Sequence, residues 1–129
     1  MEIREKTVIL VVDDREDNLF VAEALIAAYL PECRVLKARN GRQGLEEARR
    51  NGPDVILSDL QMPVMDGIEF CRHFKSDPQL AYIPFVLMTA HSTDVQTRIR
   101  GLESWADDFI LKPMENAEFV ARLKVMLRI

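Results

Sequence analysis

The chain has 129 residues, of which 48% are hydrophobic and 29% are charged, so we expect a single domain over residues 1–129 with a core of about 7–128 and no output domain. Its formal net charge of −4 argues against direct nucleic acid binding and against docking on an anionic membrane. Apolar runs far shorter than the roughly 20 residues of a membrane span, and a polar N-terminus without a signal peptide, predict a cytoplasmic protein.

Strand-like and helix-like segments alternate along the chain. Apolar runs predict five strands, in chain order at residues 7–12, 34–38, 54–58, 84–88 and 108–111. A segment with helical spacing follows each strand, and the first three of these helices are expected to end at Pro31, at Gly52-Pro53 and near Asp77-Pro78. The expected core-facing residues of the first helix are Leu19, Ala22, Leu25, Ile26 and Tyr29, and those of the last are Phe119, Val120, Leu123, Met126 and Leu127.

The fourth helix is expected at residues 93–102, with Ser92 or Thr93 as its N-terminal cap. Its apolar residues are only Val95, Ile99 and Leu102, which predicts a helix that is weakly anchored and easy to shift. The third helix carries Cys71 on its apolar stripe, so we expect a buried, reduced thiol rather than a disulfide.

The alternation of strands and helices, with several strands apolar on both sides, predicts a parallel sheet covered by helices on both faces. In such sheets the functional crevice lies beyond the carboxyl ends of the strands. Five side chains of chemical interest follow predicted strands and would meet there: Asp13, Asp14, Asp59, Thr89 and Lys112. This convergence of carboxylates, a hydroxyl and an ammonium is the strongest functional signal in the sequence.

Asp13 and Asp14 are adjacent like charges at the end of a buried strand, which is a costly arrangement. Successive strand residues point to opposite faces, so both carboxylates can converge only where the strand has ended. A hard divalent cation would relieve their repulsion, and Mg²⁺ prefers such oxygen ligands. The simpler alternative is that Asp13, Asp14 and Asp17 cap a helix N-terminus, and the presence of Asp59 and Lys112 argues against it.

Four motifs, VVDD, SDLQMPVMDG, LMTA and DFILKP, occur in an order and spacing that resemble the receiver domain of two-component response regulators, the CheY-like family. The resemblance runs from about Thr7 to the end of the chain, and the motifs are specific jointly rather than singly. It implies a flavodoxin-like α/β fold, a doubly wound (βα)5 parallel sheet of order 2-1-3-4-5. In that order the switch point lies between the first and third strands, which carry the acids.

The resemblance also implies a function. Asp59 would accept a phosphoryl group from a histidine kinase or phosphotransfer protein in a Mg²⁺-dependent reaction, with Mn²⁺ as a substitute, and the domain would catalyse its own dephosphorylation. The implied metal ligands are Asp14, Asp59 and the backbone carbonyl of Gln61, with Asp13 acting through a metal-bound water. Lys112 and Thr89 would contact the phosphoryl oxygens.

A conformational readout is implied as well. Thr89 would move to the phosphoryl group and Phe109 would turn inward, although a plain core phenylalanine is the alternative for Phe109. The face formed by the fourth helix, fifth strand and fifth helix would then change for a downstream effector or a linked output domain. In the family the bond between Lys112 and Pro113 is cis.

Two positions, Trp105 and His91, depart from the family pattern. Trp105 stands where the family usually has glycine, and we hypothesise that it contributes to a partner or homodimer surface, the alternative being that it packs over its own helix. His91 and Gln61 would flank the water that attacks the phosphorylated residue, without indicating a fast or slow rate. His73 is expected on a helix surface rather than as a phosphohistidine.

Three other functional classes fit the sequence less well. A flavodoxin-like cofactor protein shares the sheet order, but its phosphate loop is rich in Ser, Thr and Gly, whereas DDREDN is acidic. A haloacid-dehalogenase-type phosphatase has its general acid two residues after the nucleophile, where this chain has Gln61. A pseudo-receiver, which acts as a phosphorylation-independent interaction module, normally lacks the acidic pair, the acceptor or the lysine, and all of these are present.

Overall fold

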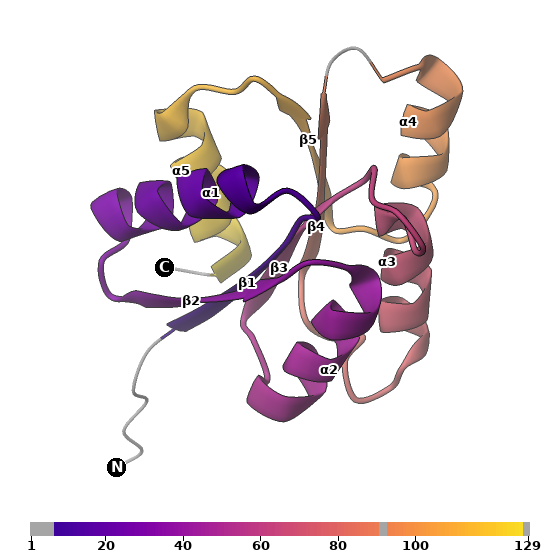
Figure 1. Cartoon of the computed structure of the whole chain (residues 1–129), viewed down its shortest axis with the longest axis horizontal. Coiled ribbons are helices and arrows are strands. Elements are labelled where there is room, and N and C mark those ends of the chain that lie inside the picture. The colour runs from indigo at the N-terminus through magenta and orange to yellow at the C-terminus, as the bar shows by residue number, and fades with distance from the viewer. Residues whose placement is uncertain (1–6, 91–92, 128–129) are drawn as a thin grey trace.

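The computed structural model describes residues 7–90 and 93–127, in which parallel strands alternate with helices (Figure 1). The strands are β1 (Thr7–Val12), β2 (Cys33–Ala38), β3 (Val55–Asp59), β4 (Phe85–Ala90) and β5 (Asp108–Lys112). The helices are α1 (Glu16–Tyr29), α2 (Gly41–Asn51), α3 (Gly67–Ser76), α4 (Val95–Leu102) and α5 (Asn116–Leu127). The sheet order is β2-β1-β3-β4-β5 with every pair parallel, which confirms the predicted doubly wound fold.

Helices cover both faces of the sheet, with α1 and α5 on one side and α2, α3 and α4 on the other (Figure 1). Strand β1 shows how one strand serves both layers. Ile9 and Val11 pack in the cluster that includes residues of α1 and α5, whereas Leu10 and Val12 pack in the cluster that includes residues of α3. Because successive side chains of a strand point to opposite faces, a strand buried on both sides appears as a continuous apolar run.

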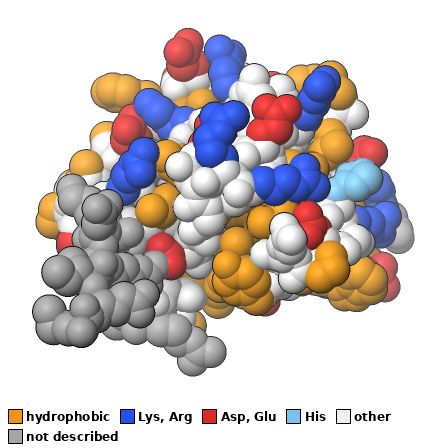
Figure 2. All heavy atoms as spheres, turned by 90° about the horizontal axis from the view of Figure 1, so that it is seen from below, with side chains coloured by type: hydrophobic (Ala, Val, Ile, Leu, Met, Phe, Trp, Pro, Cys, Tyr) orange, Lys and Arg blue, Asp and Glu red, His pale blue; other side chains and the backbone are white. Residues whose placement is uncertain are grey.

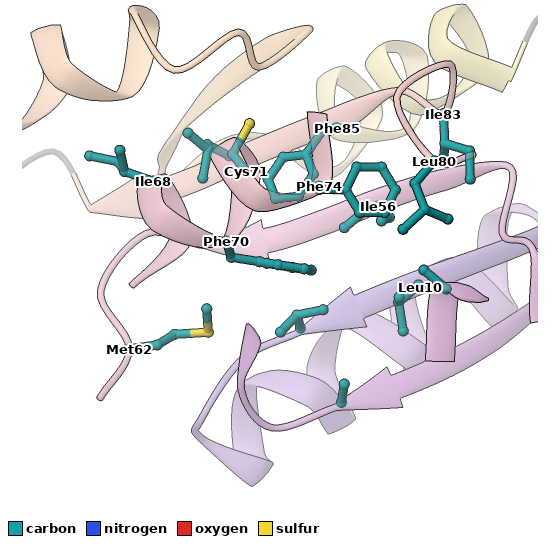
Figure 3. Close-up of a cluster of buried hydrophobic side chains, with 14 of the residues drawn as sticks. Leu10, Ile56, Met62, Ile68, Phe70, Cys71, Phe74, Leu80, Ile83 and Phe85 are labelled. Atoms are coloured by element: carbon teal, nitrogen blue, oxygen red, sulfur yellow. The ribbon is translucent and has the colours of Figure 1, made fainter. Parts of the chain in front are cut away.

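The layer under α3 is built around three fully buried phenylalanines (Figure 3). The ring of Phe85 in β4 lies 5.0 Å from that of Phe70 and 5.5 Å from that of Phe74, measured between centroids. Edge contacts of this kind add to the burial of apolar area. Cys71 lies in the same cluster with a free, buried thiol, as predicted, and burial raises its pKa to about 11.

Two helix ends differ from the prediction. Tyr29 was expected in the core, but it is 50% exposed because α1 ends there and the following Leu30 turns back onto the sheet, where it is 1% exposed. Helix α4 begins at Val95 rather than at Thr93. Its N-cap is Asp94, whose carboxylate accepts a hydrogen bond from the Thr97 N–H at 2.8 Å, so Thr93 is not the cap, and Ser92 lies outside the described residues.

Helix α4 is weakly anchored, as predicted. Its three large apolar residues, Val95, Ile99 and Leu102, are all exposed, and only Gly101 of the helix is buried. Trp105 follows the helix and is 69% exposed with a φ of 71°, so its indole is not covered by the helix. Glycine adopts this left-handed conformation without steric cost, whereas a residue with a side-chain carbon adopts it less readily.

Charged side chains of both signs are interspersed on the face that Figure 2 shows. Helix α2 carries ion pairs of this kind, such as that between Arg42 and Glu46, at 3.6 Å between nitrogen and oxygen. Exposed pairs of this type contribute little to stability. Among the described residues, the helices are too short or too polar for any of them to cross a lipid bilayer.

Candidate functional site

The predicted site residues lie at the carboxyl edge of the sheet, slightly deeper in the strands than expected. Strand β3 ends at Asp59 and β5 ends at Lys112, so both are last residues of strands rather than residues that follow them. Thr89 lies within β4, which continues to Ala90. The ladder between β4 and β5 pairs Ala90 with Lys112, which brings these strand ends to the same level.

Three carboxylates converge beside the switch point of the sheet. One oxygen from each of Asp13, Asp14 and Asp59 lies within 4.8 Å of the others. Asp13 is 2% exposed, and the other two residues are half-buried. Such an all-oxygen donor set fits a hard divalent cation and would otherwise be strongly self-repelling. The acidic triad is therefore able to hold a metal ion.

Asp13 is oriented by its own loop. One of its carboxylate oxygens accepts a hydrogen bond from the Arg15 N–H at 3.0 Å, and the other accepts one from the Asn18 side-chain amide at 3.1 Å. Arg15 occupies the N-cap position of α1 and makes no side-chain capping bond. The alternative that these acids serve as helix caps is therefore not supported. Sequence reasoning missed Asn18, because an amide at the third residue of a helix has no distinctive signature.

Asp59 is positioned by the close approach of α3. The helix begins at Gly67, whose N–H donates to the carbonyl of Leu60 at 2.7 Å. A side-chain carbon at residue 67 would collide with the carbonyl oxygen of Asp59. Glycine is thus required for the helix to start directly against the end of β3. This contact fixes the backbone on which the Asp59 carboxylate is mounted.

The electrostatics around Asp59 are unbalanced towards negative charge. Its side chain is 15% exposed, and one carboxylate oxygen lies 3.8 Å from the Lys112 ammonium. Burial, together with the negative charge of Asp13, raises the pKa of Asp59 to about 6, and the charge of Lys112 only partly opposes this. One lysine therefore does not neutralise the three acids, and additional positive charge would favour the ionised form.

Replacing Asp59 by asparagine is expected to stabilise the metal-free protein above pH 6. The raised pKa means that the folded state binds the Asp59 proton more tightly than the unfolded chain, whose carboxyl has a pKa near 3.8. Stability is therefore lost as pH rises from about 4 to about 6, and Asp59→Asn removes this loss, worth about 3 kcal/mol. Urea unfolding in a chelator at pH 4, 5, 6 and 7 measures the difference in free energy of unfolding between Asp59→Asn and wild type. This difference should be near zero at pH 4.

The exposed Glu46 of α2 provides a matched control for the loss of one negative charge. Glu46→Gln should change the free energy of unfolding little across the same pH range. Equal stability of wild type and Asp59→Asn at pH 7 would contradict a raised pKa at Asp59.

Thr89 and Phe109 connect this edge of the sheet to α4. The Thr89 side chain is buried, and its hydroxyl oxygen lies 2.7 Å from that of Thr93. The Phe109 ring is partly buried and lies against Gly101, where any side-chain carbon would collide with it. The peptide bond between Lys112 and Pro113 is cis, as expected. Thr93 was assigned from sequence only as a cap candidate, and its contact with Thr89 could not be read from the pattern.

Two predicted residues stay without a structural test. Gln61 is exposed in the loop after β3, and its carbonyl as a metal ligand remains a prediction. His91 lies outside the described residues. His73 is exposed on α3, as expected for a surface residue.

Comparison with known proteins agrees with this arrangement. Residues 9–124 match the model of the response regulator receiver domain family. The chain is 44% identical over 120 residues to the response regulator PleD of Caulobacter vibrioides. The matched region covers 93% of this chain and 26% of PleD. It is 38% identical over 125 residues to histidine kinase P4 of Formosa agariphila, covering 96% of this chain and 9% of that protein. The chain thus spans about a quarter of the length of PleD and about a tenth of that of histidine kinase P4.

Solved structures show the same fold. The receiver domain of a signal transduction histidine kinase from Syntrophus aciditrophicus superposes with a TM-score of 0.87 at 33% identity, covering 95% of this chain and 90% of that one. The receiver domain of sensor histidine kinase PA1611 from Pseudomonas aeruginosa, which has a magnesium ion coordinated in its active site cleft, gives a TM-score of 0.85 at 27% identity, covering 96% and 99%.

Proposed function

Because the chain belongs to the response regulator receiver domain family, we propose that Asp59 is its phospho-acceptor and that the donor is a histidine kinase or a phosphotransfer protein. The observation that carries the proposal is the convergence of the Asp13, Asp14 and Asp59 carboxylates beside the Lys112 ammonium. This acidic pocket is consistent with Mg²⁺-dependent aspartyl phosphorylation. Receiver domains pair with histidine kinases, and relatives of this chain are linked to further domains.

The proposed step is a phosphoryl transfer between a nitrogen and an oxygen. A carboxylate oxygen of Asp59 attacks the phosphorus, and the new O–P bond forms as the N–P bond of the donor phosphohistidine breaks. The bonding electron pair stays on the imidazole nitrogen, which takes up a proton. The Lys112 ammonium stabilises the negative charge on the transferring oxygens, and the Thr89 hydroxyl donates a hydrogen bond to another of them.

Asp14, Asp59 and the carbonyl of Gln61 are the proposed ligands of Mg²⁺ or Mn²⁺, with Asp13 acting through a water. When bound, the ion supplies the positive charge that offsets the carboxylates and the phosphoryl oxygens. The oxygen-only donor set and the excess of negative charge at Asp59 support this assignment. The magnesium ion in the PA1611 receiver domain supports it further.

The proposed readout passes through Thr89 and Phe109 to α4. Thr89 moves towards the phosphoryl group, and Phe109, which already lies against Gly101, alters its packing with the helix. Because α4 is weakly anchored, such a shift costs little free energy. The face formed by α4, β5 and α5 then favours one of two arrangements for a downstream effector or a linked output domain.

Mass spectrometry after incubation with acetyl phosphate tests the proposal. With Mg²⁺ we expect one added phosphoryl group, and none in a chelator or in Asp59→Asn. Asp66→Asn, which alters the nearby cap of α3, should still gain the group. A wild-type chain that gains no phosphoryl group would instead support a phosphorylation-independent interaction module. An adduct that persists in Asp59→Asn would place the acceptor elsewhere.

A further inference from the structure

We infer that Thr93 is a positioning residue that holds Thr89 in the unphosphorylated arrangement through a hydrogen bond between their side-chain hydroxyls. The two oxygens lie 2.7 Å apart, and both residues are buried, at 1% exposure for Thr89 and 7% for Thr93. The inference rests on the proposed function, because it concerns the residue proposed to bind the phosphoryl group.

A backbone hydrogen bond holds Thr93 close to the end of β4. The Thr93 N–H donates to the carbonyl of Ala90, the residue after Thr89, at 3.0 Å. The capping of α4 is performed by the next residue, Asp94, through the Thr97 N–H. The Thr93 hydroxyl is therefore not engaged in capping and is available to the hydroxyl of Thr89.

The contact opposes the movement of Thr89 towards Asp59. Each hydroxyl carries one donor hydrogen, and a buried hydroxyl that loses its partner pays a desolvation penalty. If Thr89 turns to a phosphoryl oxygen, it leaves the Thr93 hydroxyl without this bond. The hydrogen bond thus favours the unphosphorylated arrangement, and its loss lowers the cost of switching.

The same contact links Thr89 to the start of α4. Thr93 directly precedes Asp94, the cap of the helix, so departure of Thr89 releases the segment from which α4 begins. This route to α4 is independent of Phe109, whose ring contacts the other end of the helix at Gly101. Two residues on separate strands therefore act on the two ends of one weakly anchored helix.

The test compares Thr93→Val, which keeps the side-chain shape without the hydroxyl, with Thr93→Ser, which keeps the hydroxyl. The apparent affinity for beryllofluoride, a mimic of the phosphoryl group, is measured in Mg²⁺ by titration of backbone amide signals. We expect Thr93→Val to bind about fivefold more tightly than wild type, and Thr93→Ser to bind like wild type. In the metal-free protein, Thr93→Val should also increase exchange broadening of α4 amides.

A double-mutant cycle with Thr89→Ala separates this role from a general structural one. In the Thr89→Ala background, Thr93→Val should leave beryllofluoride affinity unchanged, because the hydroxyl partner is already absent. Thr93→Ala is a second hydroxyl-free variant if Thr93→Val does not fold.

Four outcomes would overturn the inference. Equal affinities of Thr93→Val and Thr93→Ser, or weaker binding by Thr93→Val, would show that Thr93 does not restrain Thr89. An effect of Thr93→Val that persists in the Thr89→Ala background would have another origin. These first three outcomes leave the proposed function intact if the wild type still binds beryllofluoride and gains a phosphoryl group. If the wild type does neither, the proposed function fails, and this inference fails with it.

Discussion

Replacing Lys112 by methionine should slow the transfer of a phosphoryl group to Asp59 by about 10²–10³-fold, the usual cost of removing one group that stabilises a developing charge. The Lys112 nitrogen lies 3.8 Å from an Asp59 carboxylate oxygen. It is mounted on the last residue of β5, a rigid support on which the ammonium is preorganised. Methionine keeps the length of the aliphatic chain and removes only the charge and its donors. The rate of phosphoryl incorporation from acetyl phosphate, followed by mass spectrometry, measures the effect.

Two further variants identify the source of the effect. Lys124 is an exposed lysine of α5, and Lys124→Met removes the same net charge from the domain without approaching the site. It should react like wild type. Lys112→Arg keeps the positive charge with a different shape and should fall between wild type and Lys112→Met, because a guanidinium does not replace a compact ammonium at a fixed site.

The affinity for Mg²⁺ distinguishes a loss of charge stabilisation from a collapsed pocket. Removing a positive charge beside the acidic triad should leave Mg²⁺ binding unchanged or make it tighter, since the lysine repels the ion. A Lys112→Met protein that binds Mg²⁺ normally and is phosphorylated at the wild-type rate would exclude Lys112 from the reaction. Loss of both properties would point to structural damage instead.

The convergence of the acids and the lysine could be predicted from the sequence, because it is fixed by topology rather than by side-chain packing. Strands apolar on both sides imply a parallel sheet, and the carboxyl ends of parallel strands meet at one edge. Asp14, Asp59 and Lys112 come from three different strand ends, yet their convergence needed only the strand assignments and the sheet order. Errors of one residue in the predicted strand ends did not change this conclusion, since each of these side chains still lies at the carboxyl edge of the sheet.

Details that depend on local geometry could not be predicted. The exposure of Tyr29 and burial of Leu30 depend on where α1 leaves the helical path, which helical periodicity alone does not locate. The N-cap of α4 is Asp94 rather than Thr93. The sequence does not distinguish the two, because both residue types are good N-caps. That small shift has a consequence for the site, since it leaves the Thr93 hydroxyl to contact Thr89. Pairings between side chains on separate segments require the backbone coordinates.

Replacing Lys75 by methionine is expected to lower the free energy of unfolding by about 3 kcal/mol, because it leaves several oxygen acceptors without their shared donor. The Lys75 side chain is only 10% exposed, and its nitrogen lies 2.7 Å from an Asp107 carboxylate oxygen. The same nitrogen donates to the carbonyls of Ala81 and Ile83, at 3.0 and 2.8 Å. Asp107 in turn accepts the Phe85 N–H at 2.8 Å, so this ion pair joins the end of α3 to the start of β4.

The exposed pair of Lys37 and Glu23, at 2.8 Å, is a matched control. Its side chains are 45% and 41% exposed, so Lys37→Met should cost less than about 1 kcal/mol. Urea unfolding in a chelator measures both variants, and equal stability of Lys75→Met and wild type would mean that water satisfies the acceptors. The ion pair of Lys75 and Asp107 lies at the amino ends of β4 and β5, at the opposite edge of the sheet from the acidic triad. Folded Lys75→Met should therefore accept a phosphoryl group at the wild-type rate, whereas Lys112→Met should remain folded and react about 10²–10³-fold more slowly.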